Sequence, residues 1–241
     1  HADERTRAVA ASAVQFFSGH RTNLAAIGRF CRERNIFFIV DAIQAIGHMA
    51  FDVQAMKIDV LATGGMKSLL ALPGAGFIYV RDQVATSMQP RLIHGNSTID
   101  YMHWLAYDLS PQPGAARLAS GTPNVPGVLS IGASLTLLNE LGPANIDAHT
   151  TALTHYAIDA LTGEGYEVIT PADAAGPITT FHSPFDSETT DRLVQYLADR
   201  QVVVCKHLDA GSKAYVRASV HGYNTTADID RLVEEMRGFA S

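Results

Sequence analysis

The chain has 241 residues, enough to bury a core without disulfides or structural metals, and its composition is typical of a folded globular protein. A formal net charge of −6 argues against a nucleic-acid partner, which would need a basic surface. No apolar run reaches the roughly 20 residues of a membrane span. The two cysteines, Cys31 and Cys205, form no CxxC pair, so we expect a cytoplasmic protein without a zinc site, disulfide scaffold or membrane anchor.

The first part of the chain alternates short apolar runs with segments of helical periodicity, which predicts an α/β domain over residues 1–145. The continuous apolar run 36–40 is typical of a parallel strand that is covered on both faces. The elements we expect here are strands at 11–17, 36–40, 60–63 and 76–80, and a helix capped by Thr22 or Asn23 that ends at Asn35.

Prolines and glycines interrupt regular structure in residues 85–124. Long irregular segments inside compact domains are usually functional, so this segment is expected at the active site or a dimer interface. Beyond it the pattern predicts a small α+β domain over residues 146–241. The remaining expected elements are helices at 125–141, 144–161, 188–200 and 226–239, and strands at 166–169, 178–182, 202–205 and 214–219.

Three polar residues stand where strands end. Asp41 follows the run 36–40 directly, Lys67 follows Gly64-Gly65 after the next strand, and Arg217 lies near the end of a later strand. Ligands of parallel α/β sheets bind at the carboxyl ends of strands, so these side chains are candidates for a binding site. Taken singly, each has a plain structural interpretation: a turn aspartate, a solvated lysine and a surface ion pair.

Together, Asp41, Gln44 and Lys67 suit pyridoxal phosphate (PLP). This cofactor needs a carboxylate at its ring nitrogen, a hydrogen bond to its ring oxygen and a lysine amine for a Schiff base. A carboxylate beside the ring nitrogen raises the pKa of that nitrogen and keeps it protonated, which lets the ring accept electrons. A dinucleotide enzyme is disfavoured because no GxGxxG follows a strand.

Residues 39–81 (IVDAIQAIGHMAFDVQAMKIDVLATGGMKSLLALPGAGFIYVR) resemble the class V aminotransferase family of fold-type I PLP enzymes. The resemblance continues in Ser120-Gly121-Thr122-Pro123-Asn124 and in Val216-Arg217-Ala218-Ser219 with Tyr223-Asn224-Thr225. It implies a large domain with a mostly parallel sheet and a small C-terminal α+β domain. The family contains aminotransferases, isopenicillin-N-epimerase-like proteins and cysteine desulfurases.

The resemblance also implies a role for each matching residue. Lys67 is the Schiff-base lysine, Asp41 the ring-nitrogen partner and Gln44 the ring-oxygen partner. Arg217 binds the carboxylate of a small amino-acid substrate. Gly121 and Thr122 contact the cofactor phosphate of the neighbouring subunit, which implies a homodimer with shared active sites.

The chain departs from the family pattern close to the lysine. Met66 stands where the family has His or Gln, Gly64 stands where it often has Ser, and Ala71 replaces a glycine. Each hydrogen bond lost to the phosphate could cost about 1.5–3 kcal/mol of cofactor affinity. The family's N-terminal portion, with its phosphate-binding turn, has no counterpart, so we expect the 241 residues to be part of an enzyme of about 370–400 residues.

The sequence does not select one reaction among those that PLP enzymes of this family catalyse. Transamination, epimerisation and elimination all begin with removal of a proton from the substrate α-carbon, and aminotransferase or epimerase-like chemistry is the main expectation. Cys205 ends the apolar run VVVC and is expected in the core, as is Cys31, which disfavours a sulfur-accepting role. The alternatives are a cysteine desulfurase or lyase and a non-catalytic homologue that binds the cofactor weakly.

Among the histidines, His20, His48 and His94 are weaker candidates for ligand contact, and no metal-ligand spacing is present.

Overall fold

A computed structural model describes residues 2–103 and 105–240. It divides into two compact units, which are described separately below. Unit 1 comprises residues 1–13, 23–46 and 51–138, and unit 2 comprises residues 14–22, 47–50 and 139–241. The expected domain boundary at residue 145 remains a prediction, because both units here are built from more than one stretch of the chain.

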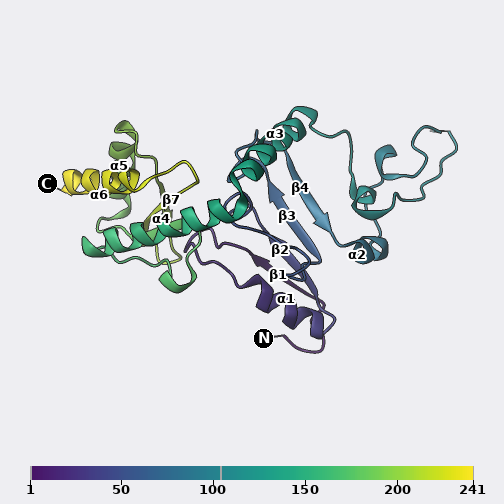
Figure 1. The fold of residues 1–241 in the computed structure, drawn as a ribbon, viewed down its shortest axis with the longest axis horizontal. Coiled ribbons are helices and arrows are strands. Elements are labelled where there is room, and N and C mark those ends of the chain that lie inside the picture. The colour runs from purple at the N-terminus through teal and green to yellow at the C-terminus, as the bar shows by residue number, and fades with distance from the viewer. Residues whose placement is uncertain (1, 104, 241) are drawn as a thin grey trace. The chain divides into compact units, whose positions relative to one another are not determined.

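Unit 1 contains a four-stranded sheet in the order β1-β2-β3-β4 (Figure 1). β1, β2 and β3 are parallel, whereas β4 runs antiparallel to β3. The parallel part confirms the expected α/β class. The strands are β1 (Ala8–Ser12), β2 (Phe37–Asp41), β3 (Val60–Gly64) and β4 (Gly76–Val80).

The two faces of this sheet differ in burial. Phe38, Val40 and Leu61 are buried on one face, and helix α1 (Leu24–Glu33) packs against β2. Asn23 caps α1 through its side-chain oxygen, which accepts the Ala26 N–H at 3.1 Å, as the sequence predicts. Alternate residues of a strand point to opposite faces, so the other face, with Phe37, is exposed in this structure.

The remainder of unit 1 leads from the sheet to a long helix. In the described residues between α2 and α3, the regular structure consists of two short 3₁₀ helices. This matches the expected irregular segment, and helix α3 has the bounds predicted from sequence. The elements are α2 (Asp82–Ser87), η1 (Gly95–Ser97), η2 (Gly114–Leu118) and α3 (Val125–Leu141).

Unit 2 is an α+β layer with a three-stranded antiparallel sheet in the order β5-β7-β6. Its elements are α4 (Pro143–Gly163), η3 (Ala172–Ala174), β5 (Ile178–His182), α5 (Ser187–Asp199), β6 (Cys205–Leu208), β7 (Ala214–Ser219) and α6 (Thr226–Ala240).

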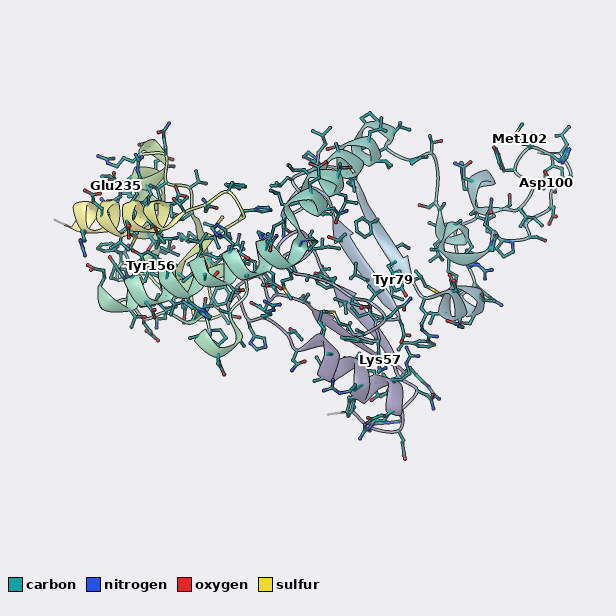
Figure 2. All side chains as sticks on the ribbon, viewed as in Figure 1. Lys57, Tyr79, Asp100, Met102, Tyr156 and Glu235 are labelled. Carbon is teal, nitrogen blue, oxygen red and sulfur yellow. The ribbon has the colours of Figure 1, made fainter. Side chains whose placement is uncertain are left out.

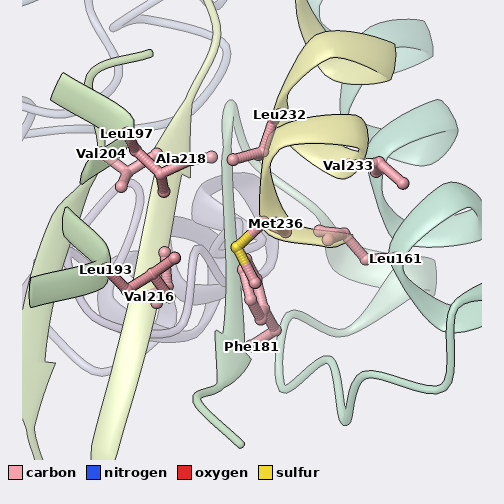
Figure 3. Packing of buried hydrophobic residues seen from close by; sticks show 10 residues of the cluster. All are labelled: Leu161, Phe181, Leu193, Leu197, Val204, Val216, Ala218, Leu232, Val233 and Met236. Carbon is pink, nitrogen blue, oxygen red and sulfur yellow. The ribbon is translucent and has the colours of Figure 1, made fainter. Parts of the chain in front are cut away.

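Helices α4, α5 and α6 supply apolar side chains to the core of unit 2, where they meet Phe181 of β5 and Val216 of β7 (Figure 3). Phe181, Val216, Leu193 and Leu197 are completely buried. Arg217, the next residue of β7, is half-buried and points to the opposite face of the same sheet.

Three expected strands differ from the structure. The first strand ends at Ser12 rather than at residue 17, because residues after Val14 form a turn. In that turn the Gln15 side-chain oxygen accepts the backbone N–H groups of Phe17 and Ser18, both at 2.6 Å. Such side-chain bonds compete with strand pairing.

The other two differences lie in unit 2. Strand β6 begins at Cys205, where the sequence predicted an end, because residues 205–208 pair with β7. The expected strand at 166–169 is reduced to one bridge between Val168 and Phe181. Both errors come from apolar residues that lie outside the strand ladders, and Val203 among them is exposed.

Within the described residues, no single helix combines the length and the apolar character needed to cross a membrane. The pair α3 and α4 passes that test jointly, by length and composition only, and is bent by 79°.

Candidate cofactor and substrate sites

Asp41 is the last residue of β2 and lies at the carboxyl end of the parallel strands. Its main chain is fixed, because its carbonyl oxygen accepts the Ala13 N–H at 2.8 Å. Its Oδ1 accepts the Ile43 N–H at 3.0 Å, which closes a turn directly after the strand. The carboxylate is exposed, so Oδ2 can accept a hydrogen bond from a ligand.

Lys67 lies in the turn that follows β3. The turn is closed by backbone bonds from Leu70 N to Lys67 O and from Ala71 N to Gly65 O, both 2.9 Å long. Gly65 is required here, since a Cβ would lie 3.1 Å from Ala71 Cβ and 3.2 Å from Ala75 O. The Lys67 side chain is exposed, and its ammonium forms no hydrogen bond or ion pair with the described residues.

The structure brings these two segments together at one edge of the sheet. β2 and β3 are parallel neighbours, so Asp41 and the Lys67 turn follow the same ends of adjacent strands. Ser68 Oγ lies 3.5 Å from Ile43 O, which joins the turn after β3 to the turn after β2. Asp41 and the Lys67 turn therefore lie at the same edge of the sheet, and the convergence of the Asp41 carboxylate with the Lys67 amine stays a prediction.

A pocket of about 440 Å³ lies beside Asp41. Its floor is formed by β3 and β4, where small residues leave room for a flat ring. Its lining residues are Asp41, Ile43, Ala62, Thr63, Gly64, Gly76, Phe77 and Ile78. The space and the free carboxylate oxygen fit the pyridine ring of PLP.

The remaining unit 1 candidates are less constrained. Gln44 is half-buried in the turns after β2, and its amide makes no hydrogen bond with the described residues. Met66 is exposed next to Lys67 and has no hydrogen-bond donor in its side chain, so it cannot replace the missing phosphate contact. The roles of Gln44 and Lys67 toward the cofactor stay predictions, and the Met66 side chain offers no donor to a phosphate.

Gly121 and Thr122 precede α3. Gly121 has φ +151° with open space around its α-carbon, and the Thr122 side chain is exposed. Nearby, Asn124 Nδ2 donates to Gly74 O at 3.3 Å, which links this segment to the loop after Lys67. The Thr122 hydroxyl has no partner among the described residues, so it is available to a ligand or a second subunit.

Arg217 belongs to β7 of unit 2. Its Nη1 donates to Phe16 O at 3.0 Å, and its Nη2 lies 3.7 Å from Cys205 Sγ. Its Nε is buried without a hydrogen-bond partner. An unpaired buried donor is unfavourable, and an arginine fork binds a carboxylate in two-pronged fashion, so the side chain fits a substrate carboxylate.

The expectation that Cys205 lies in the core is wrong. It is an exposed free thiol on β6, not a core residue, because β6 pairs with β7 in the register Cys205–Arg217. Cys31 is buried, as predicted. The next residue on the same face of β6 is His207, whose pKa is lowered by burial and by the charge of Arg217. Only the strand register reveals that Cys205 and His207 lie beside the candidate substrate arginine.

Unit 2 also contains a buried histidine pair. The rings of His48 and His221 lie 4.5 Å apart, and His221 stacks on Tyr223 at 5.1 Å. Burial, together with His221, lowers the pKa of His48 to about 3, although the charge of Asp147 acts in the opposite direction. His48 is therefore neutral at neutral pH, and its Nδ1 is buried without a partner.

The sequence as a whole matches a known family. The model of the family "Aminotransferase class-V" matches residues 1–232. The chain belongs to the class V aminotransferase family. Among curated relatives, a "Probable cysteine desulfurase" of Methanothermobacter thermautotrophicus is 30% identical over 99% of this chain and 62% of its own length. The "Uncharacterized aminotransferase YcbU" of Bacillus subtilis is 25% identical over 98% of this chain and 60% of its own length.

Solved structures show the same class V fold. The apo cysteine desulfurase of Thermococcus onnurineus NA1 has a TM-score of 0.85 and 22% identity, covering 96% of this chain and 59% of its own. A C-DES mutant with glycine covalently linked to its PLP cofactor also has a TM-score of 0.85, with 19% identity and coverage of 98% of this chain and 61% of its own. The chain thus spans about 60% of the length of these relatives.

These comparisons confirm the family, the fold class and the cofactor expected from sequence. The cofactor of the class V family is pyridoxal phosphate, and the Asp41 carboxylate beside the pocket is an acceptor of the kind that its ring nitrogen needs. Among the described residues, no group of three or more His, Cys, Asp or Glu side chains is placed to hold a metal ion.

Proposed function

We propose that this protein is a PLP-dependent enzyme that acts on an amino acid. The observation that carries the proposal is the convergence of Asp41 and the Lys67 turn at one sheet edge, beside a pocket of about 440 Å³. When bound there, PLP supplies an electron-accepting ring for the substrate α-carbon.

In the proposed mechanism, each candidate residue of this chain has its own role. Asp41 Oδ2 would accept a hydrogen bond from the protonated ring nitrogen, and the Gln44 amide would donate to the ring oxygen. Lys67 Nζ is the amine that holds the cofactor aldehyde carbon and, once released, removes the substrate α-proton as general base. Arg217 binds the substrate carboxylate, exchanging its weak Cys205 contact for a charge-assisted one.

For the reaction branch, we propose cleavage of a carbon–sulfur bond in a cysteine-like substrate. Relatives named cysteine desulfurase support this over the aminotransferase expectation. Exposed Cys205, 3.7 Å from Arg217 Nη2, is the thiol of this chain placed to accept sulfur. The name of the Bacillus subtilis relative supports the alternative, aminotransferase chemistry.

The assay combines PLP binding with product analysis. Protein with PLP is expected to show the visible absorbance of a lysine-bound cofactor, and Lys67→Ala to abolish it, whereas Lys213→Ala serves as a matched exposed-lysine control. With L-cysteine, alanine and a persulfide on Cys205 are expected, and an added dithiol reductant is expected to release the outer sulfur as sulfide; Cys205→Ser is expected to remove the protein-bound persulfide. Keto-acid formation that requires a second keto acid as amino-group acceptor, releases no ammonia and is unaffected by Cys205→Ser would establish the aminotransferase branch. Absence of the absorbance at saturating PLP would refute the enzyme proposal in favour of a non-catalytic homologue.

We also propose a homodimer in which Gly121 and Thr122 serve the cofactor phosphate of the partner subunit. Support comes from exposed apolar side chains in the same part of unit 1, such as Leu105 and Leu129, because such surfaces usually mark an interface. Light scattering coupled to size exclusion tests this, and a monomer at micromolar concentration contradicts it. Free Cys31 and Cys205 support a cytoplasmic location.

A further inference from the structure

A second pocket of unit 1 lies at the opposite end of the sheet from Asp41. Val60 begins β3 and pairs with Val80, which ends β4, so both mark the amino end of the parallel strands. The pocket beside them has a volume of about 430 Å³. Because Asp41 and Gly64 lie at the carboxyl end of the strands, this pocket is separate from the cofactor site.

Three cationic side chains line this pocket: Arg32 from the last turn of α1, Lys57 from the turn before β3, and Arg81 after β4. Asp82 is the only acidic side chain among the described lining residues. In a chain with a net charge of −6, this clustering of positive charge is a local exception. Cations gathered in a recess raise the local concentration of anions.

A buried carboxylate orients the two arginines. Asp59 is 4% exposed, and its Oδ1 accepts Arg81 Nε at 2.7 Å and Arg32 Nη2 at 3.4 Å. Its Oδ2 accepts the Phe38 N–H at 2.9 Å, so the carboxylate itself is fixed by the sheet. A guanidinium carries five N–H donors, and Asp59 uses one from each arginine, which leaves donors for a ligand.

Lys57 differs from the arginines because it forms no ion pair with Asp59. Its ammonium makes no hydrogen bond or ion pair with the described residues. Its backbone has φ +54°, a conformation that favours glycine. The Lys57 side chain lines the pocket. Figure 2 shows Lys57 together with Tyr79, which also lines the pocket.

We propose that this pocket binds a small organic phosphomonoester. A phosphomonoester carries close to two negative charges at neutral pH and has three strong acceptor oxygens, which match two arginine forks and one lysine. With Asp59 and Asp82 counted, the three cations leave one net positive charge, so a dianion is favoured over a monoanion. Val53, Ile58 and the Tyr79 ring supply an apolar wall for the organic part.

The test is isothermal titration calorimetry of protein saturated with PLP and freed of excess cofactor, with phenyl phosphate as the probe. Lys57→Gln is expected to weaken binding about tenfold, the loss of one charge-assisted contact. Arg29→Gln, which removes an exposed arginine of the same helix as Arg32, is the matched control and is expected to bind as wild type. Benzoate, a monoanion with the same ring, is expected to bind at least about tenfold more weakly.

Lys57→Gly separates ligand binding from fold stability. Glycine relieves the backbone at φ +54°, so the melting temperature is expected to be unchanged or higher while phenyl phosphate binding weakens by about tenfold, as in Lys57→Gln. Equal binding by wild type and Lys57→Gln, or equal loss in Arg29→Gln, would overturn the proposal, as would equal affinity for benzoate. Lys67→Ala is expected to abolish catalysis without affecting this pocket, so the two proposals fail independently.

Discussion

The buried histidine pair makes the stability of this protein depend on pH in a way that can be calculated. His48 is 8% exposed and contacts His221, and burial lowers its pKa from 6.5 to about 3. The unfolded chain therefore binds a proton at mildly acidic pH that the folded chain excludes. Stability from this group is fully present above about pH 6.5 and is lost progressively as pH falls toward 3.

The magnitude follows from the two pKa values of His48. The separation between them corresponds to a loss of about 5 kcal/mol in the free energy of unfolding. This full loss is reached when the pH has fallen to the folded pKa. Between about pH 7 and about pH 5, the expected loss in the free energy of unfolding is about 2 kcal/mol. For a domain of this size, that equals a fall in melting temperature of about 4–8 °C.

The assay is urea unfolding of wild type and His48→Gln across this pH range. Glutamine has no titrating group, so the variant is expected to lose about 2 kcal/mol less stability than wild type on acidification. His20→Gln, which removes an exposed histidine of the same unit, is expected to keep the wild-type dependence. Parallel curves for wild type and His48→Gln would refute the reasoning.

Other predictions concern packing. Gly28→Ala places a Cβ 1.9 Å from Met56 O and is expected to cost more than about 2 kcal/mol in chemical denaturation. Gly132→Ala meets nothing within 4 Å on α3 and is expected to stabilise by about 0.5–1 kcal/mol, so a similar effect of both changes would contradict this account. Phe181→Ala empties a fully buried site and is expected to cost about 3–5 kcal/mol, whereas Val203→Ala, at an exposed position of the same unit, is expected to change stability by less than about 0.5 kcal/mol.

Much of the fold follows from local pattern. The strands at 76–80, 178–182 and 214–219 and the helix at 125–141 have the predicted bounds, because each is an apolar run closed by turn residues. The run at residues 14–17 is different. It has the composition of a strand, but the Gln15 side chain bonds to the backbone of Phe17 and Ser18 and turns the chain. A competing side-chain bond of this kind is not visible in hydrophobic periodicity.

The candidate site likewise has residues that the sequence identifies and a property that it does not. Asp41 and Lys67 could be identified because chemistry requires particular residue types at strand ends, and strand ends can be read from the chain. The exposure of Cys205 could not be predicted from the sequence. It depends on which residue of β6 faces Arg217, and a shift of one residue would turn Cys205 to the other face of the sheet.

The sequence alone therefore determined the family, the cofactor and the order of the elements, because these depend on residue types and on spacing along the chain. The tertiary structure decided the accessibility of Cys205, the neutral state of His48 and the gathering of Arg32, Lys57 and Arg81 around one pocket. These properties arise from strand register, burial and charge between residues distant in sequence, and local patterning carries no information about them.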